Sequence, residues 1–240
     1  MNRADIQFVQ SLRLKKNRDE SRLFIAEGKK LVDDLLHSLK PYHIYGTEDC
    51  DAPVFSLVSQ AEMKKMSGFA TPSTVLGVFY QPAGNLHLDF TQTWCVALDG
   101  VQDPGNVGTI IRLCDWFGID TLLCSPTTAD GYAPKVVQAT MGAIARIRLI
   151  YSNLATLLPT LNTPIFGTFL EGKNIYQTPL PQSGIIVLGS EGQGISKEVA
   201  AVVQQKLYIP SFAKGKRSES LNVAMATAVV CSEICRGGVV

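Results

Sequence analysis

Three polar loops in the second half of the 240-residue chain carry side chains that can do chemistry. The first loop, residues 99–108, contains Asn106 and leads into a segment that carries Arg112. The second, residues 189–194, has the sequence GSEGQG and contains Glu191, whose carboxylate can accept hydrogen bonds from an arginine or an amide. In this order along the chain, the loops indicate one site assembled from several segments.

The third loop begins at Ile209-Pro210 and closes with Ser220, Leu221 and Asn222. The glycines at 189–194 match neither G-x-G-x-x-G nor G-x-x-x-x-G-K-[ST], so a dinucleotide site or P-loop is poorly supported. Glycine at these positions permits a close approach of backbone to a flat ligand. The competing interpretation is that each loop is an ordinary turn, with Ser220 or Asn222 capping the next helix.

Arg112 lies in a segment whose other residues are mostly apolar. A charge in such a helix is costly unless it is paired or belongs to a site. The alternative is a surface arginine on the one polar stripe, paired with Asp115. Asn106 has two interpretations as well, because it also fits the N-cap of the predicted helix.

The elements around the loops predict an α/β fold with a largely parallel sheet and helices on both faces. Ligands of such sheets bind at the carboxyl ends of strands, and all three loops follow predicted strands. We expect strands at 94–98, 120–124, 144–150, 165–169, 185–189 and 206–210, and helices at 106–117, 133–140, 152–160, 196–204 and 222–236.

The first 80 residues predict a small αβ unit, in which the polar stretch Lys15–Arg22 follows the first helix. Ser59 and Glu62 have the spacing of a capping box. We therefore expect a domain at 1–80, a linker at 81–92 and a second domain at 93–240. Within the first domain we expect helices at 5–14, 28–39 and 59–66, and strands at 23–26, 41–45, 54–57 and 75–80.

Basic residues concentrate in two places although the net charge is only +1. Residues 3–30 hold eight basic and four acidic residues, and residues 206–217 hold four basic residues and no acid. Such patches indicate docking of a polyanion, with solvated surface as the alternative. The expected contacts are Arg13, Lys15, Lys16 and Arg18 in the first patch, and Lys214, Lys216 and Arg217 in the second.

The remaining bulk features predict a cytoplasmic protein. No apolar run approaches the roughly 20 residues that span a bilayer, and the N-terminus lacks the apolar core of a signal peptide. The six cysteines are scattered without a Cys-x-x-Cys pair, so we expect reduced, buried thiols and no metal site.

The three loops resemble the SpoU (TrmH-like) family of RNA 2′-O-ribose methyltransferases, within the SPOUT superfamily. The matching segments are DPGNVGTIIR at 103–112, LGSEGQGIS at 188–196, and IP…SLNVA at 209–224. Residues 5–80, with LFIAEG at 23–28, resemble the L30e-like substrate-binding domain that often precedes this catalytic domain.

The resemblance implies methyl transfer from S-adenosylmethionine to a ribose 2′-hydroxyl of a structured RNA, ribosomal or transfer RNA. It also implies a trefoil knot, a cofactor bound by the knotted loops, and a homodimer that completes the active site. The apolar helix expected near the C-terminus favours the dimer too. The implied cofactor-binding residues are Leu188, Gly189, Ser190, Ile209 and Leu221. The implied catalytic residues are Asn106, Arg112, Glu191, Ser220 and Asn222.

Arginine is a poor general base because its pKa exceeds about 12. We interpret Arg112 as a clamp on a phosphate beside the target ribose, oriented by Glu191 and Asn222. The loop 211–219 is longer and more basic than in compact family members, which favours phosphate contacts there. Two other functions stay open: a non-catalytic RNA-binding protein on this scaffold, and a nucleotide-dependent enzyme of ordinary doubly wound type.

Overall fold

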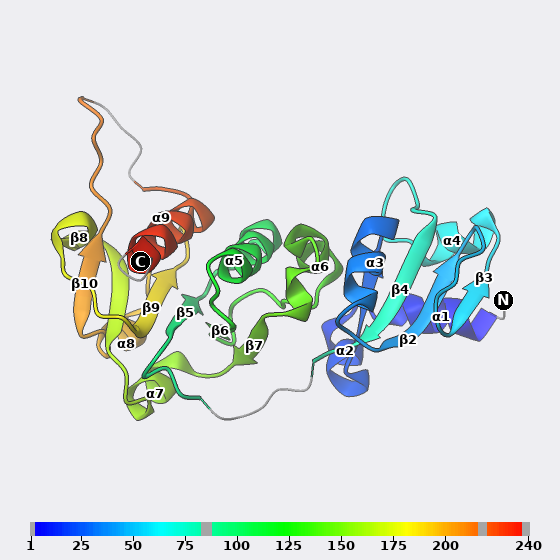
Figure 1. Ribbon diagram of the computed structural model, residues 1–240, viewed down its shortest axis with the longest axis horizontal. Coiled ribbons are helices and arrows are strands. Elements are labelled where there is room, and N and C mark those ends of the chain that lie inside the picture. Colours follow the sequence, from blue (N-terminus) through cyan, green and yellow to red (C-terminus); the bar gives the residue numbers. More distant parts are fainter. Residues whose placement is uncertain (1–2, 83–87, 216–219, 237–240) are drawn as a thin grey trace. The chain divides into compact units, whose positions relative to one another are not determined.

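The computed structural model describes residues 3–82, 88–215 and 220–236, which form two compact units (Figure 1). The first unit contains the described residues within 1–83 and also Asp130–Arg146, and the second contains those within 84–129 and 147–240. The division into domains at 1–80 and 93–240 stays a prediction. The segment Asp130–Arg146 packs with the N-terminal sheet. Its helix α6 (Pro134–Thr140) contacts strand β1 (Leu23–Glu27).

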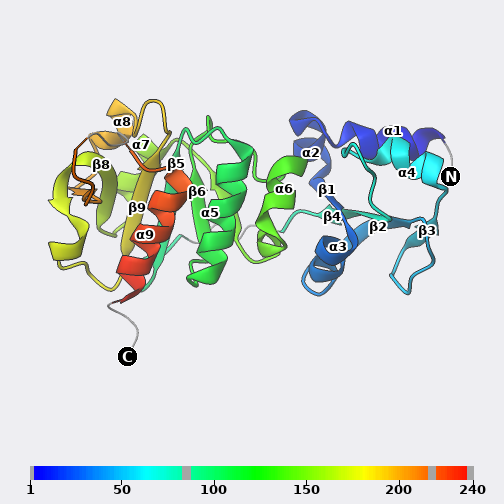
Figure 2. The same ribbon diagram turned by 90° about the horizontal axis from the view of Figure 1, so that it is seen from above.

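The first unit is built on a four-stranded sheet in the order β1-β4-β2-β3. Strands β1 and β2 run antiparallel to β4, and β3 runs parallel to β2. Figure 2 shows helices α1 and α4 on one face and α3 on the other. The remaining bounds are β2 Pro41–Gly46, β3 Phe55–Leu57, β4 Val75–Tyr80, α1 Arg3–Ser11, α2 Lys15–Ser21, α3 Lys29–Leu36 and α4 Gln60–Met66.

The capping box predicted at the start of α4 is confirmed, whereas α2 was not predicted. Ser59 and Glu62 form the predicted capping box, with the Ser59 N–H donating to Glu62 Oε2 at 2.8 Å. Helix α2 forms where the sequence predicted only a polar stretch. Its residues are polar on every side, so it has no apolar periodicity to detect, and a buried arginine holds it in place, as described below.

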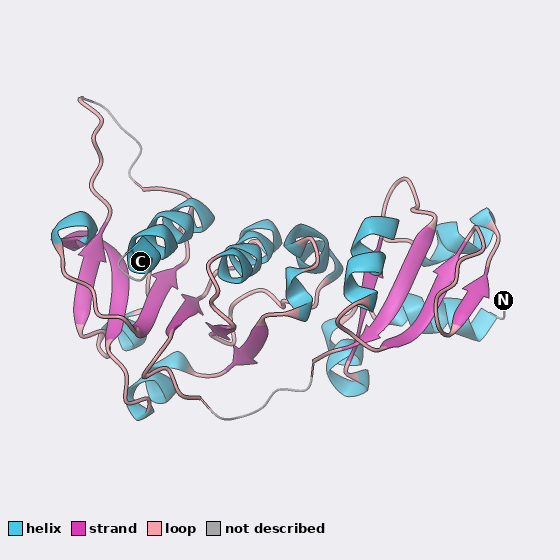
Figure 3. Cartoon of the chain, viewed as in Figure 1, coloured by secondary structure: helices cyan, strands magenta, loops and turns pink. Residues whose placement is uncertain are grey.

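The second unit contains a six-stranded, fully parallel sheet in the order β10-β8-β9-β5-β6-β7, which confirms the predicted fold class (Figure 3). Helices α5 and α9 cover one face, and α7 and α8 cover the other (Figure 2). The bounds are β5 Trp94–Asp99, β6 Thr121–Cys124, β7 Arg148–Tyr151, β8 Ile165–Asn174, β9 Gly184–Gly189, β10 Gln205–Tyr208, α5 Pro104–Trp116, α7 Leu154–Leu157, α8 Lys197–Ala200 and α9 Val223–Arg236.

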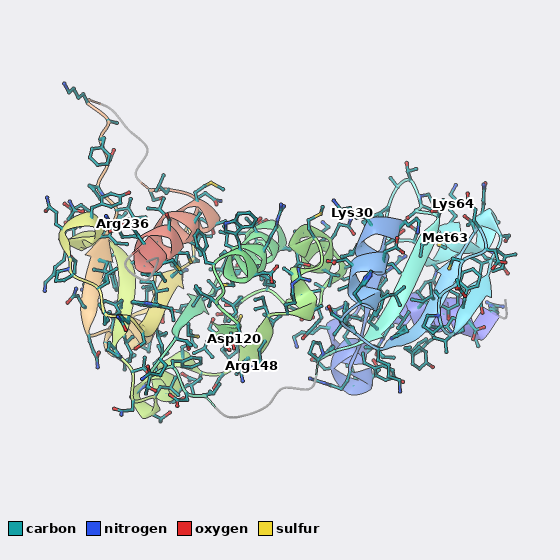
Figure 4. The ribbon with its side chains drawn as sticks, viewed as in Figure 1. Lys30, Met63, Lys64, Asp120, Arg148 and Arg236 are labelled. Atoms are coloured by element: carbon teal, nitrogen blue, oxygen red, sulfur yellow. The ribbon has the colours of Figure 1, made fainter. Side chains whose placement is uncertain are left out.

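Several elements differ in length from the prediction. The strand expected at 144–150 begins only at Arg148, because Ala143–Ala145 forms a 3₁₀ turn after Gly142, whose φ is +93°. Arg148 then fixes β7 on β6, since its Nη2 donates to Thr121 Oγ1 at 2.6 Å and lies 3.7 Å from Asp120 Oδ1 (Figure 4). Helix α8 is one short turn, whereas β8 runs five residues further than expected.

The two sheets bury separate cores. In the second unit, β5 and β9 pack with α7 and α8 through side chains such as Ala97, Leu154 and Val187. In the described part of the chain, no helix is long and apolar enough to cross a membrane. The trefoil knot stays a prediction, because the path that would form it includes residues 216–219, which lie outside the described residues.

Candidate active site

The site lies where β5 and β9 end side by side. Asp99, the last residue of β5, is paired in register with Gly189, the last residue of β9. The Asp99 side chain is only 7% exposed, and its Oδ2 accepts a hydrogen bond of 2.7 Å from the Ser196 N–H. This buried carboxylate therefore anchors the far end of the glycine-rich loop to the neighbouring strand. Sequence reasoning missed Asp99 as a site residue, although its place at a strand end was visible.

Gly189 is glycine because the chain folds back against it. A Cβ on Gly189 would lie 2.0 Å from the carbonyl carbon of Gly194 and 2.1 Å from the Ile195 nitrogen. Ser190 and Gly194 exchange two backbone hydrogen bonds of 3.1 and 2.9 Å, and Gly194 has a φ of +68°. This glycine therefore makes room for its own loop, and its contact with the cofactor stays a prediction.

Three predicted catalytic residues, one from each loop, meet in a single hydrogen-bond network. The Asn106 Nδ2 donates to Glu191 Oε1, and the Asn222 Nδ2 donates to Asn106 Oδ1 at 3.0 Å. The Asn222 Oδ1 also accepts from the N–H groups of Ala224, at 2.9 Å, and Met225, at 3.3 Å, and so caps α9. Asn222 thus serves both interpretations that the sequence left open, as a cap and as a site residue.

Asn106 is free to join this network because another residue caps α5. Asp103 is the N-cap, its Oδ1 accepting from the Asn106 N–H at 2.8 Å, and Pro104 is the first helical residue. The prediction of Asn106 as the cap was wrong by three residues. Asp followed by Pro is a recognised start of a helix, so the sequence did contain the signal.

Arg112 lies apart from the network. Its side chain is exposed and forms no hydrogen bond or ion pair with any described residue. It lies six positions after Asn106 in the helix, which places the two side chains about 120° apart around the axis of α5. Within one subunit Glu191 and Asn222 bond to Asn106 and not to Arg112, so the expectation that they orient Arg112 stays a prediction.

The predicted cofactor residues divide by their exposure. Leu188 is 1% exposed and its side chain belongs to the core, so its predicted contact with the cofactor would have to come from its backbone. Ser190 Oγ accepts from the Gln193 N–H at 3.2 Å. Ile209 is half-buried just after β10, while Leu221 is 51% exposed and Ser220 is also exposed. Ile209 and Leu221 thus offer apolar surface beside polar loops, which suits the flat face of a base on a polar ligand.

The buried cysteines are not poised to act as nucleophiles. All six are free thiols, and four of them are buried. Burial raises the pKa of Cys114 and raises that of Cys231 to about 12, so both thiols stay protonated at neutral pH. Among the described residues, no group of three or more metal-type ligands occurs.

In the first predicted RNA patch, Arg13 and Arg18 form hydrogen bonds within the protein. Arg18 is only 3% exposed, and its guanidinium donates to Asp130 Oδ2 at 3.0 Å and to the carbonyl of Leu12 at 2.8 Å. Arg13 donates to the carbonyl of Met66 at 2.7 Å and so satisfies the end of α4. The assignment of Arg18 to RNA is corrected, since a buried ion pair cannot reach a phosphate.

The other predicted RNA contacts are lysines and one arginine at the surface. Lys15 pairs with Asp19 at 2.7 Å, and Lys16 lies 3.8 Å from Glu20, both within α2. Lys214 is exposed. Lys216 and Arg217 lie outside the described residues, so their contact with RNA stays a prediction.

Comparison with known families matches both units. The SpoU rRNA Methylase family profile matches residues 93–232. The profile of the MRM3-like substrate binding domain matches residues 3–77. The first of these matches spans more than half of the chain and contains all three loops of the site.

Individual relatives align along almost the whole chain. The 23S rRNA (guanosine(2553)-2′-O)-methyltransferase RlmP of Bacillus subtilis is 28% identical over 231 residues, which cover 91% of each protein. A solved TrmH-family protein from Porphyromonas gingivalis is 39% identical, with a TM-score of 0.89 and 99% coverage of both chains. An AdoMet-bound rRNA methyltransferase from Sinorhizobium meliloti is 26% identical, with a TM-score of 0.85 and coverage of 99% and 96%.

Proposed function

Since the chain belongs to the SpoU rRNA Methylase family, we propose that it transfers a methyl group from S-adenosylmethionine to a ribose 2′-hydroxyl of a structured ribosomal or transfer RNA. The observation that carries this proposal is the network of Asn106, Glu191 and Asn222, which joins three loops at the strand ends. The names of RlmP and of the AdoMet-bound relative support the reaction and the cofactor.

The residues divide the work between holding the cofactor and placing the ribose. Bound S-adenosylmethionine supplies a methyl group on a sulfonium, which is a good leaving group, so alignment is the main task of the protein. Ile209 and Leu221 provide apolar walls for the cofactor. The turn at Gly189 and Ser190, which the Ser190–Gly194 backbone hydrogen bonds hold in shape, places its backbone beside them. The network around Asn106 orients the hydroxyl.

We propose that the active protein is a homodimer and that Arg112 acts across the dimer. Arg112 is exposed and lies apart from the network of its own subunit. Trp116 lies one helical turn after Arg112 on α5 and is 83% exposed. An apolar surface of this kind beside an unpaired arginine fits a second copy of the chain. The guanidinium would then clamp a phosphate beside the ribose.

We assign the first unit to binding the RNA substrate, in line with the substrate-binding profile that matches it. We also propose that Lys214 contacts RNA phosphates from the loop after β10, together with Lys216 and Arg217. Reversal of these charges is expected to weaken RNA binding and to flatten its salt dependence. The proposed location is the cytoplasm.

The proposed reaction is tested with purified protein, S-adenosylmethionine labelled in its methyl group, and unmodified ribosomal and transfer RNA. Label in nucleotides that resist alkaline cleavage supports transfer to the 2′-oxygen, because alkali needs a free 2′-hydroxyl. Label on a base would overturn the 2′-O assignment. Calorimetry that detects RNA binding but no binding of S-adenosylmethionine would favour the non-catalytic alternative, and binding of a dinucleotide would favour the doubly wound enzyme.

The shared site is tested by mixing two impaired variants. Arg112→Lys keeps the charge but loses the planar fork, so we expect most activity to be lost while the affinity for S-adenosylmethionine stays the same. Asn106→Asp impairs the network of its own subunit. If Arg112 acts across the dimer, an equal mixture regains about a quarter of the wild-type activity, because half of its dimers are mixed and each mixed dimer has one intact site of two. No recovery after proven subunit exchange would contradict the arrangement.

A further inference from the structure

We infer that three aromatic rings in the first unit form a stacking platform for unpaired nucleobases of the RNA substrate. The platform consists of Phe8 on α1, Tyr42 on β2 and Tyr80 on β4, with Lys40 beside it. The inference rests on the proposed function, because it names the part of the RNA that this unit holds.

The three rings form a row from the core to the surface. The ring centroids of Phe8 and Tyr42 lie 5.5 Å apart, and those of Tyr42 and Tyr80 lie 5.9 Å apart in an edge-on arrangement. Phe8 is half-buried and packs against the core, whereas Tyr42 is 42% exposed and Tyr80 is 41% exposed. The inner ring thus supports two outer rings that solvent can reach.

The strand pattern explains why these rings are accessible. Tyr80 has the same parity along β4 as Leu76 and Val78, which are fully buried in the core that includes α1 and α4. At the end of the strand this face is no longer covered, and Tyr80 is left open beside Tyr42.

The charge beside the platform suits a nucleic acid. Lys40 is exposed, and its Nζ lies 5.7 Å from the centre of the Tyr80 ring. Aromatic rings accept bases of any sequence by stacking, and a neighbouring cation can meet the phosphate of the same nucleotide. Bases in a duplex are already stacked on each other, so the platform selects loops, bulges or single strands.

Most of the basic residues that the sequence assigned to RNA in this unit are already paired within the protein, so RNA binding there needs other contacts. Arg18 is buried and the Arg13 guanidinium satisfies α4, while Lys15 and Lys16 face acidic partners in α2. Stacking on the platform therefore supplies a contact that this stretch of charges does not. A protein partner is the competing occupant, and the experiment below separates it from RNA.

The test measures the affinity of the full-length protein for two fluorescent RNAs, a hairpin with an unpaired loop and a blunt duplex of equal length. The test variant carries Tyr42→Leu and Tyr80→Leu, since leucine keeps the apolar bulk but removes the flat ring. Loss of stacked bases is expected to weaken hairpin binding about tenfold or more, with little effect on the duplex. Tyr42→Phe with Tyr80→Phe keeps the rings and is expected to bind like the wild type.

Two control variants match the platform residues. Phe69 in the same unit is 39% exposed and is not one of the platform rings, so Phe69→Leu is expected to leave hairpin binding unchanged. Lys64 is an exposed lysine on α4 (Figure 4), and Lys64→Gln is expected to weaken binding less than Lys40→Gln. Binding of S-adenosylmethionine and the circular dichroism spectrum check that every variant is folded.

The inference is overturned if the leucine variant binds the hairpin like the wild type while the wild type still binds and methylates RNA. The proposed function then stands without the platform. If the wild type binds neither RNA, the proposed function fails and the inference fails with it. A change of molecular mass in sedimentation, without a change of RNA affinity, would assign the rings to a protein interface and would also overturn it.

Discussion

Asn106 is the residue on which the three loops of the site converge. Its amide donates to Glu191 and accepts from Asn222, so it uses both halves of its side chain. An amide can do this because it carries a donor and an acceptor, whereas a carboxylate only accepts. One side chain therefore links all three loops of the site.

Replacing Asn106 by aspartate tests this role. The new carboxylate would face the Glu191 carboxylate with no proton between them, and it could only accept from Asn222. Removal of one hydrogen bond to a charged group costs about 1.5–3 kcal/mol, so we expect kcat/KM to fall about tenfold or more. Steady-state methyl transfer measures the loss.

The control for this prediction is Gln193→Ala, a change at an exposed side chain of the same loop as Glu191. It is expected to keep the activity within about twofold, because ordinary surface substitutions change free energies by less than about 0.5 kcal/mol. Equal activity of Asn106→Asp and the wild type would remove the network from the mechanism.

At the scale of the element, the glycine-rich turn after β9 depends on the absence of one side chain. A methyl group on Gly189 would meet the backbone of Gly194 and Ile195, which cannot move without breaking the Ser190–Gly194 bridge. Gly192 lies in the same turn, but a methyl group there would meet nothing within 4 Å, and its φ is not positive. Gly192→Ala is therefore a control for Gly189→Ala, because it adds the same methyl group to the same turn without a clash.

We expect Gly189→Ala to lower the affinity for S-adenosylmethionine about tenfold or more, because the turn must shift to relieve the clash. Gly192→Ala is expected to bind the cofactor like the wild type. Isothermal titration calorimetry measures both affinities. If the two variants bind equally well, the turn does not shape the cofactor site.

Helix α2 shows how one buried charge can hold an element that has no apolar face. The Arg18 side chain is 3% exposed and the paired Asp130 side chain is 12% exposed. Removing one partner of such a buried pair leaves the other charge without compensation, which costs about 3–5 kcal/mol. An exposed pair within a helix contributes only about 0.3–0.5 kcal/mol.

Arg18→Met is therefore expected to lower the free energy of unfolding by about 3–5 kcal/mol. Lys16→Met is the control, because Lys16 is exposed and its nitrogen lies 3.8 Å from Glu20, and we expect a change below about 0.5 kcal/mol. Urea denaturation followed by circular dichroism measures both. A similar small change in the two variants would show that α2 is held by something other than this ion pair.

At the scale of the whole molecule, the first unit draws on a segment from the middle of the chain. The Phe24 ring is fully buried and lies 5.3 Å from the ring of Tyr132, and Asp130 pairs with Arg18. A fragment of residues 1–82 lacks both partners. Its sheet would expose an apolar ring and leave a buried arginine unpaired.

We expect the fragment 1–82 to melt at a lower temperature than the same fragment joined to residues 130–146 by a flexible linker. The added segment restores the contacts of Tyr132 and the ion pair to Arg18. Thermal unfolding by circular dichroism compares the two constructions. Equal melting temperatures would mean that Asp130–Arg146 only rests on a sheet that is stable without it.

The sequence alone was sufficient wherever the signal was local. Apolar runs at 94–98 and 185–189 predicted β5 and β9 to within one residue at either end, and the spacing of Ser59 and Glu62 predicted the capping box. Local signals also carried the resemblance, because each of its three segments is short. At the start of α5 the sequence offered two N-caps, and the prediction chose Asn106 over Asp103, which is followed by a proline and is the actual cap.

Contacts between residues distant in sequence were decided only by the tertiary structure. Asn106 meets Glu191 and Asn222 across 85 and 116 positions, and Arg18 meets Asp130 across 112. Burial decides whether an arginine stabilises the fold, as Arg18 does, or can contact RNA. The composition of a segment does not show which of its residues are buried. The sequence by itself determined the strands, the loops and the family of chemistry. Only the packing of the chain decided which side chains form the site, because a charge or an amide acquires its role from the groups brought beside it.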